Sequence, residues 1–252
     1  QLVVGSINTE YHATIPAGQV IRQTPAARTL VGTGSEVTLV VSLGVAPAGP
    51  WGGGINFIDP DGRVVNTRGM CADGTSSLII RADLLPAGVA TSSVQCVITP
   101  SIGSLSSMRY NSASGIAEWT YSSPLSLSSS SGTTTTISVA VSVNDVSRSK
   151  NLDLARPPVV LMHGLNGDAS GWLPMQEYLQ VSGFKFVYRH DYHSRSCDRF
   201  TSNIDIPERA IDNALNDARR NGFLALKVDY VGHSMGGVLG RMYVQDLGGE
   251  DH

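Results

Sequence analysis

The chain has 252 residues and a net charge of −3, from 18 lysine and arginine residues against 21 aspartate and glutamate residues. This balance, without any run of basic residues, excludes a basic nucleic-acid-binding protein. Hydrophobic residues make up 41% of the chain, which is enough for a folded core. Because no apolar stretch reaches the ~18 residues that a membrane-spanning helix requires, no membrane span is expected.

The first 150 residues alternate short β-branched runs with turns that contain proline and glycine, a pattern typical of all-β modules. Two segments of this part, residues 14–27 and 34–42, together resemble the second half of a PASTA repeat. That family is a cell-wall-associated module found in tandem on bacterial surface proteins. Its usual opening strand and helix would precede Gln1, so residues 1–44 are predicted to form a partial PASTA-like β module.

A second β module is predicted over residues 45–147. Its last strand shows the clearest alternation, because every second residue of the segment 137–143 is isoleucine or valine and the others are small or polar. With the run of residues 117–121, this pattern suggests an immunoglobulin-like sandwich. Residues 148–156 are predicted to be a linker to a third part, residues 157–252.

Two of the three cysteines, Cys71 and Cys96, fall within the second module. They are predicted to form a disulfide, because β-sandwiches of oxidising compartments often carry one; the alternative is two buried thiols. The third cysteine, Cys197, would be buried or paired with a cysteine outside this chain. The disulfide, the surface-type modules and the scarcity of lysine favour a secreted or cell-surface protein.

The third part alternates strand and helix patterns. Strands are predicted over residues 159–162, 184–188 and 224–231, and helices over residues 171–182, 207–220 and 238–247. This order predicts a parallel sheet with crossover helices. The predicted fold class is therefore multidomain, with small all-β modules followed by an α/β unit.

Two motifs of this part follow predicted strands. Ser234 lies in a G-x-S-x-G motif at a sharp turn between a strand and a helix, where Gly232 and Gly236 leave room for close packing. The alternative is a glycine-rich turn that contains a serine by chance. The second motif follows the first strand of the part and consists of His163-Gly164-Leu165-Asn166-Gly167.

Together the two motifs resemble those of α/β-hydrolase lipases and esterases, over residues 157–248. The resemblance implies that Ser234 is the nucleophile and that the backbone N–H groups of Leu165 and Met235 form the oxyanion hole. It implies no cofactor, because serine acyl transfer needs none. Supporting roles fall to His163, Gly164, Gly232, His233 and Gly236, with both histidines expected to serve packing.

In that family the acid and the histidine of the triad follow the serine on later strands, whereas 18 residues follow Ser234 here. The part is therefore expected to be an incomplete, N-terminal half of an α/β-hydrolase domain that associates with a missing C-terminal segment. His190 and His193 resemble a metal-binding pair, but no further ligands with metal-binding spacing accompany them, so no metal is predicted.

These features predict a serine hydrolase of carboxylic esters, a lipase or esterase of lipid metabolism that takes an ester or lipid substrate. Its N-terminal modules would attach it to a cell-wall or surface polymer. The alternative is a cell-surface or cell-wall binding protein whose hydrolase portion is inactive or vestigial.

Overall fold

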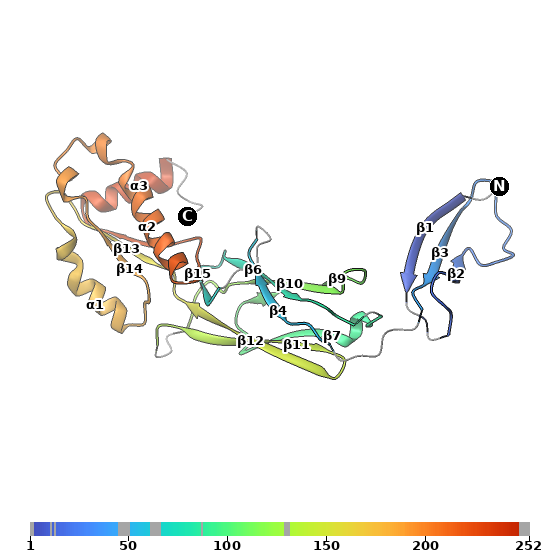
Figure 1. Cartoon of the computed structure of the whole chain (residues 1–252). Coiled ribbons are helices and arrows are strands. Elements are labelled where there is room, and N and C mark those ends of the chain that lie inside the picture. The colour runs from blue at the N-terminus through green and yellow to red at the C-terminus, as the bar shows by residue number, and fades with distance from the viewer. Residues whose placement is uncertain are drawn as a thin grey trace.

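The structure is a computed structural model that describes residues 3–10, 12, 14–44, 51–60, 67–86, 88–128 and 132–246. Three parts follow one another along the chain: an N-terminal module, a β-sandwich and a C-terminal unit with the helices α1, α2 and α3 (Figure 1). Within these residues, no helix is both long and apolar enough to cross a membrane.

The N-terminal module is a three-stranded sheet in the order β1-β3-β2. β1 (Val3–Glu10) pairs in parallel with β3 (Glu36–Ser42), and β2 (Val20–Thr24) pairs antiparallel with the other edge of β3. Two of its buried residues are Val40 and Ser42, and the Ser42 hydroxyl donates to the carbonyl of Ile15 at 2.6 Å. Most of the other side chains of this sheet remain in contact with solvent.

The central part is a β-sandwich of two five-stranded sheets. The first sheet runs in the order β4 (Ile55–Ile58), β6 (Ser77–Ala82), β10 (Ile116–Ser122) and β8 (Ser104–Leu105). A fifth strand, β9 (Arg109–Asn111), also pairs with β10. The second sheet runs β15 (Phe223–Leu224), β5 (Gly69–Cys71), β12 (Val146–Ala155), β11 (Thr135–Val143) and β7 (Val94–Thr99).

The core of the sandwich comes from the alternation seen in the sequence. In β11 the side chains of residues 137, 139, 141 and 143 are all buried, whereas the intervening ones are partly exposed. They pack against the buried residues of β6 and β10, such as Ile80 and Tyr121, between the two sheets. Trp51 enters the same core, and its indole N–H donates to the carbonyl of Asp83 at 2.7 Å.

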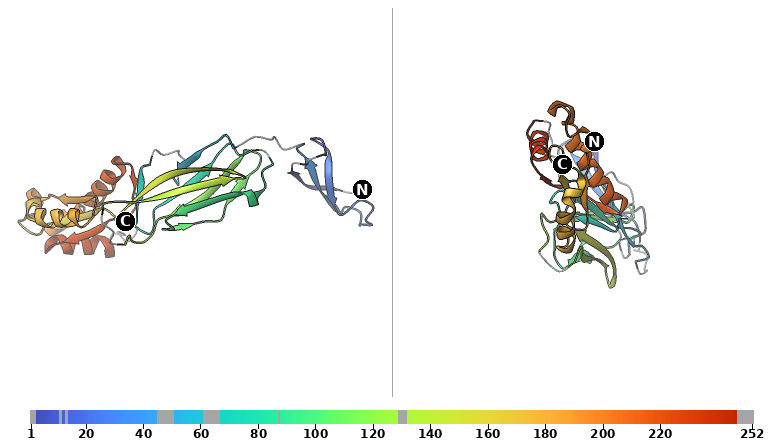
Figure 2. Two further views of the ribbon diagram at one scale, coloured as in Figure 1. Left: turned by 90° about the horizontal axis from the view of Figure 1, so that it is seen from below. Right: turned by 90° about the vertical axis from the view of Figure 1, so that its left-hand side faces the viewer.

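The C-terminal unit contains a three-stranded parallel sheet in the order β14-β13-β16. Its strands are β13 (Val159–Met162), β14 (Val187–His190) and β16 (Asp229–Gly232), and the central strand β13 is fully buried. Two views place α1 (Leu173–Val181) on one side of these strands, with α2 (Ile206–Arg220) and α3 (Met235–Asp246) on the other (Figures 1 and 2). Buried residues of α2 and α3, among them Ala210 and Leu239, pack on Val160 and Met162 of β13.

The C-terminal unit follows the sandwich strand β12 without the predicted linker, and its strand β15 joins a sheet of the sandwich. β12 continues to Ala155, so the linker predicted over residues 148–156 is a strand instead. The predicted strand 224–231 is divided, because β15 pairs with β5 of the sandwich and β16 starts only at Asp229. A cluster of buried residues joins the two parts: Cys71 and Ala155 from the sandwich pack with Phe186, Leu215 and Phe223.

The fold class predicted from the sequence is wrong. The described chain is mostly β sheet, with three α-helices of 9, 15 and 12 residues, so the chain is not an α/β protein. The α/β prediction rested on the strand and helix pattern after residue 157. In the structure these residues form a sheet of three short strands, and their strand β15 joins a sheet of the sandwich. Assignment to an α/β-hydrolase is therefore not retained.

Candidate functional site

Ser234 occupies the turn between β16 and α3 in a left-handed backbone conformation, with φ of +52°. This conformation is costly for a residue with a side chain. The flanking glycines are needed for close packing: a Cβ on Gly232 would lie 2.5 Å from the amide nitrogen of Gly237, and one on Gly236 would lie 2.5 Å from the carbonyl oxygen of His163. The turn therefore holds a strained, exposed serine between two positions that admit no side chain.

The loop after β13 lies against this turn. A Cβ on Gly164 would lie 2.8 Å from the Cβ of Ser234, so glycine is required for the two segments to meet. The loop then folds back on itself, because the amide of Gly167 donates to the carbonyl of Gly164 at 3.1 Å, and Asn166 adopts a φ of +53°. The structure thus brings the two sequence motifs into contact.

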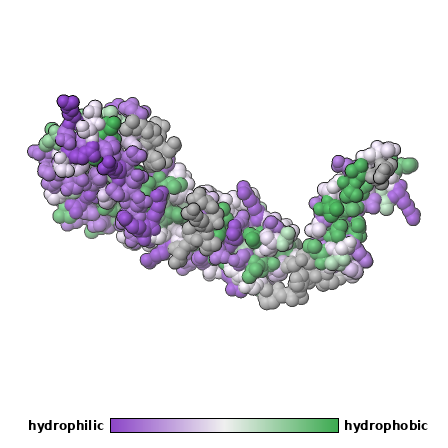
Figure 3. Space-filling view, turned by 45° about the horizontal axis from the view of Figure 1, so that its top comes forward, coloured by the Kyte–Doolittle hydropathy of each residue, from purple (hydrophilic) through white to green (hydrophobic). Residues whose placement is uncertain are grey.

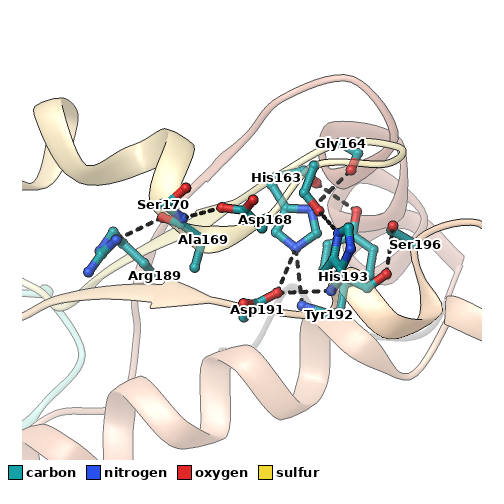
Figure 4. Close-up of polar contacts among 11 residues, drawn as sticks. His163, Gly164, Asp168, Ala169, Ser170, Arg189, Asp191, Tyr192, His193 and Ser196 are labelled. Carbon is teal, nitrogen blue, oxygen red and sulfur yellow. Dashed lines mark hydrogen bonds and ion pairs between the residues drawn. The ribbon is translucent and has the colours of Figure 1, made fainter.

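His163 holds this loop in place (Figure 4). Its ring is buried and stacks on the ring of Tyr192, with 4.1 Å between centroids. Nε2 accepts the backbone N–H of Tyr192 at 3.1 Å, so Nδ1 carries the proton and donates to the carbonyl of Gly164 at 3.0 Å. The Tyr192 hydroxyl donates to the His163 carbonyl at 2.6 Å, and Asp191 Oδ1 lies 3.4 Å from Nε2. These contacts occupy both ring nitrogens of His163 and give the side chain a structural role.

A cavity of about 500 Å³ opens between the two motifs. Leu165, Trp172, His233 and Ser234 line it, together with Asp168. His233 is exposed to this cavity and is not a buried packing residue, which differs from the role expected for it. The predicted oxyanion residue Leu165 lies on the cavity wall, and Met235 follows Ser234 as the first residue of α3, where backbone N–H groups have no acceptor within the helix.

The motifs did not reveal the polar wall of the cavity. Asp168 caps the short helical turn Ala169–Trp172 and accepts the backbone N–H of Ser170 at 2.6 Å. Hydrogen bonds from the Ser170 side chain and backbone lower the pKa of Asp168, and nearby His193 contributes. Aspartate is a preferred N-cap residue, so the identity of Asp168 was the signal in the sequence for this cap.

The two histidines considered as a metal pair have other surroundings. The Nδ1 atom of His193 lies 2.9 Å from the carbonyl oxygen of Gly167 and so contacts the loop of the site. Burial lowers the pKa of His190, and the neighbouring His163 adds to this effect. Among the described residues, no group of three or more histidine, cysteine, aspartate or glutamate side chains could hold a metal ion.

The predicted disulfide is wrong, because Cys71 and Cys96 are free thiols. Cys71 is on β5 and Cys96 is on β7, and the strands β12 and β11 separate them in the same sheet. Three strand spacings amount to ~14 Å, whereas the Cα atoms of a disulfide lie less than ~7 Å apart. Cys197, the third cysteine, is exposed.

Comparison with known proteins identifies the N-terminal module. Residues 1–43 match the model of the PASTA domain. No curated protein matches the chain. Two solved structures are similar to parts of it. The adhesin InvE of Yersinia pseudotuberculosis is 13% identical with a TM-score of 0.29, over 44% of this chain and 31% of that one. The D00-D0 domain of intimin is 13% identical with a TM-score of 0.28, over 60% of this chain and 96% of that one.

The likeness to the two solved structures is too low to support an argument about function. The comparisons give no support to the predicted hydrolase family. The prediction of a lipase of lipid metabolism is therefore wrong, as is the predicted fold class. The chain carries a PASTA domain at residues 1–43, where the sequence pattern predicted a partial PASTA-like module over residues 1–44.

Proposed function

We propose that this chain is a cell-surface binding protein that attaches to a cell-wall or surface polymer through its N-terminal module. The observation that carries the proposal is the PASTA match over residues 1–43. The sandwich behind this module then serves as a spacer between the attached polymer and the C-terminal unit. A protein with this arrangement acts outside the cell or on its surface.

The surface of the N-terminal module is suited to an extended polymer. β1 is an edge strand in the order β1-β3-β2, and residues 3–9 carry no charge. Val4 and Ile7 on this strand are 59% and 60% exposed, and Figure 3 shows apolar side chains gathered on this module. An uncharged edge strand offers backbone donors and acceptors beside apolar contacts, the combination by which sheet edges bind extended chains.

Co-sedimentation with insoluble, purified bacterial cell walls tests this proposal. Ile7→Asp places a charge on the exposed edge strand of the module and is expected to reduce the sedimented fraction severalfold. Val97→Asp is the matched control, because Val97 is 53% exposed on β7, the edge strand of a sandwich sheet. Equal sedimentation of all three proteins, or loss in the control alone, would contradict binding through this module.

A second candidate function is serine-dependent cleavage of a carboxylic ester at Ser234. It is favoured by the left-handed backbone of Ser234 and by its place on the wall of a cavity of about 500 Å³. In this proposal the Ser234 hydroxyl attacks the ester carbonyl, the C–O bond to the leaving group breaks in the tetrahedral intermediate, and the serine proton passes to the leaving oxygen, which departs as an alcohol. The backbone N–H groups of Leu165 and Met235 stabilise the oxyanion, and water releases the acyl group from the serine.

Labelling with a fluorophosphonate probe tests the second candidate separately from polymer binding. One adduct on Ser234 is expected in the unaltered chain and none in Ser234→Ala. Ser170→Ala is the control, because Ser170 lines the same cavity and its hydroxyl is not assigned to the reaction. An unaltered chain that takes no adduct would remove the second candidate and leave the binding proposal intact.

A further inference from the structure

The carboxylate of Asp73 is buried where the sandwich meets the C-terminal unit. Asp73 follows β5 and is 6% exposed. On the sandwich side, Oδ1 accepts the backbone N–H groups of Thr75 and Ser76 at 3.0 and 2.7 Å and the hydroxyl of Ser123 at 3.1 Å. The hydroxyl of Ser76 donates to Oδ2 at 2.6 Å. These contacts fix the carboxylate in the sandwich.

The other side of the same carboxylate holds the C-terminal unit. Oδ2 accepts the backbone N–H groups of Leu226 at 3.0 Å and Lys227 at 3.4 Å, more than 150 positions later in the chain. These two residues connect β15, which pairs with β5, to β16, which leads to Ser234. The carboxylate therefore anchors the segment from which the strand of the serine departs.

The hydrogen bonds account for the charge of Asp73 in a buried place. Burial raises the pKa of this carboxyl, but the bonds from Ser76, Leu226 and Thr75 outweigh burial and lower it overall. An ionised carboxylate with so many donors rigidifies the groups that surround it.

We infer that Asp73 is a positioning residue for Ser234, through which the sandwich sets the start of β16 and so the place of the serine. The proposal deepens the second candidate function and rests on it for the reactivity of Ser234. The hydrogen bonds that Asp73 accepts from the amides of residues 226 and 227 do not depend on that reactivity. The strength of these hydrogen bonds and the positioning of Ser234 are therefore measured separately.

Hydrogen exchange of the full chain measures the hold directly. In Asp73→Asn, exchange at the amides of Leu226 and Lys227 is expected to rise at least about tenfold, the factor that corresponds to one lost charge-assisted hydrogen bond. Asp83→Asn is the matched control. Asp83 lies beyond the opposite end of β6 and its carboxylate accepts from Gly54 and Asn56, both within the sandwich.

Labelling of Ser234 by the fluorophosphonate probe measures positioning. Asp73→Asn is expected to lower the maximal labelling rate severalfold and to leave the half-saturating probe concentration unchanged, because the cavity wall formed by residues 163–172 remains. Unchanged amide exchange in Asp73→Asn, or an equal rise in Asp83→Asn, would overturn the inference. Faster exchange with an unchanged labelling rate would also overturn it, whereas absence of labelling in the unaltered chain would instead contradict the second candidate function.

Discussion

Replacing Ser234 by glycine is expected to stabilise the protein, although it removes the candidate nucleophile. Ser234 has a φ of +52°, and a side chain in this left-handed region costs ~1–2 kcal/mol. Glycine removes that cost but loses ~0.5–1 kcal/mol more chain entropy on folding. The Ser234 side chain is exposed, so little burial is lost. The net gain is about 0.5–1 kcal/mol of unfolding free energy, a rise of about 1–4 °C in the melting temperature of a domain of this size.

Urea unfolding and thermal melting of three variants test this reasoning. Ser234→Ala keeps a Cβ in the left-handed region and should lie within about 0.5 kcal/mol of the unaltered protein. Ser149→Gly is the opposite control, because Ser149 is exposed in the regular strand β12 and glycine there should cost about 0.5–1 kcal/mol. If Ser234→Gly is no more stable than Ser234→Ala, the turn stores no strain and the argument for a functional serine loses its physical basis.

Three further predictions concern the sandwich and the three cysteines of the chain. The pKa of Asp73 is lowered in the folded protein, so its stabilisation is present above its unfolded pKa of ~3.9 and is lost as the pH falls through the lower folded value. Urea titrations between pH 2 and 6 should show this loss, and Asp73→Asn should flatten it; an unchanged slope would contradict the assignment. Trp51→Ala should cost about 3–5 kcal/mol in urea unfolding, because its side chain is 1% exposed in the core, and a cost below about 1 kcal/mol would contradict that packing. Alkylation without reductant should modify Cys197 first and all three thiols after denaturation, because burial raises the pKa of Cys71 and Cys96 to about 12; two unreactive cysteines in the denatured chain would indicate a disulfide.

The local sequence pattern predicted those structural features that depend only on neighbouring residues. The alternation over residues 137–143 predicted β11 and its buried face, since side chains of a strand alternate between its two sides. The strand, turn and helix around Ser234 likewise follow from a few consecutive residues, and the structure places a strand before it and a helix after it.

The sequence pattern did not predict which distant segments pair with one another. β15 has two residues, and nothing in Phe223-Leu224 indicates that they pair with Gly69 and Met70 of β5. The disulfide prediction failed for the same reason, because the spacing of two cysteines does not tell how many strands lie between them. Asp73 gave no indication of its role, since two of its six donors, the backbone N–H groups of Leu226 and Lys227, come from the other end of the chain. The fold class was wrong because a strand–helix pattern does not reveal which sheet each strand joins.

Binding of the unaltered chain to purified bacterial cell walls tests the central claim most directly. Protein left in the supernatant is measured at increasing protein concentration over a fixed amount of insoluble wall and at constant ionic strength. The account predicts saturable depletion with a dissociation constant below ~1 mM, which corresponds to about −4 kcal/mol of binding free energy. Depletion that grows in proportion to protein concentration without saturation, or no depletion, would contradict a cell-surface binding function.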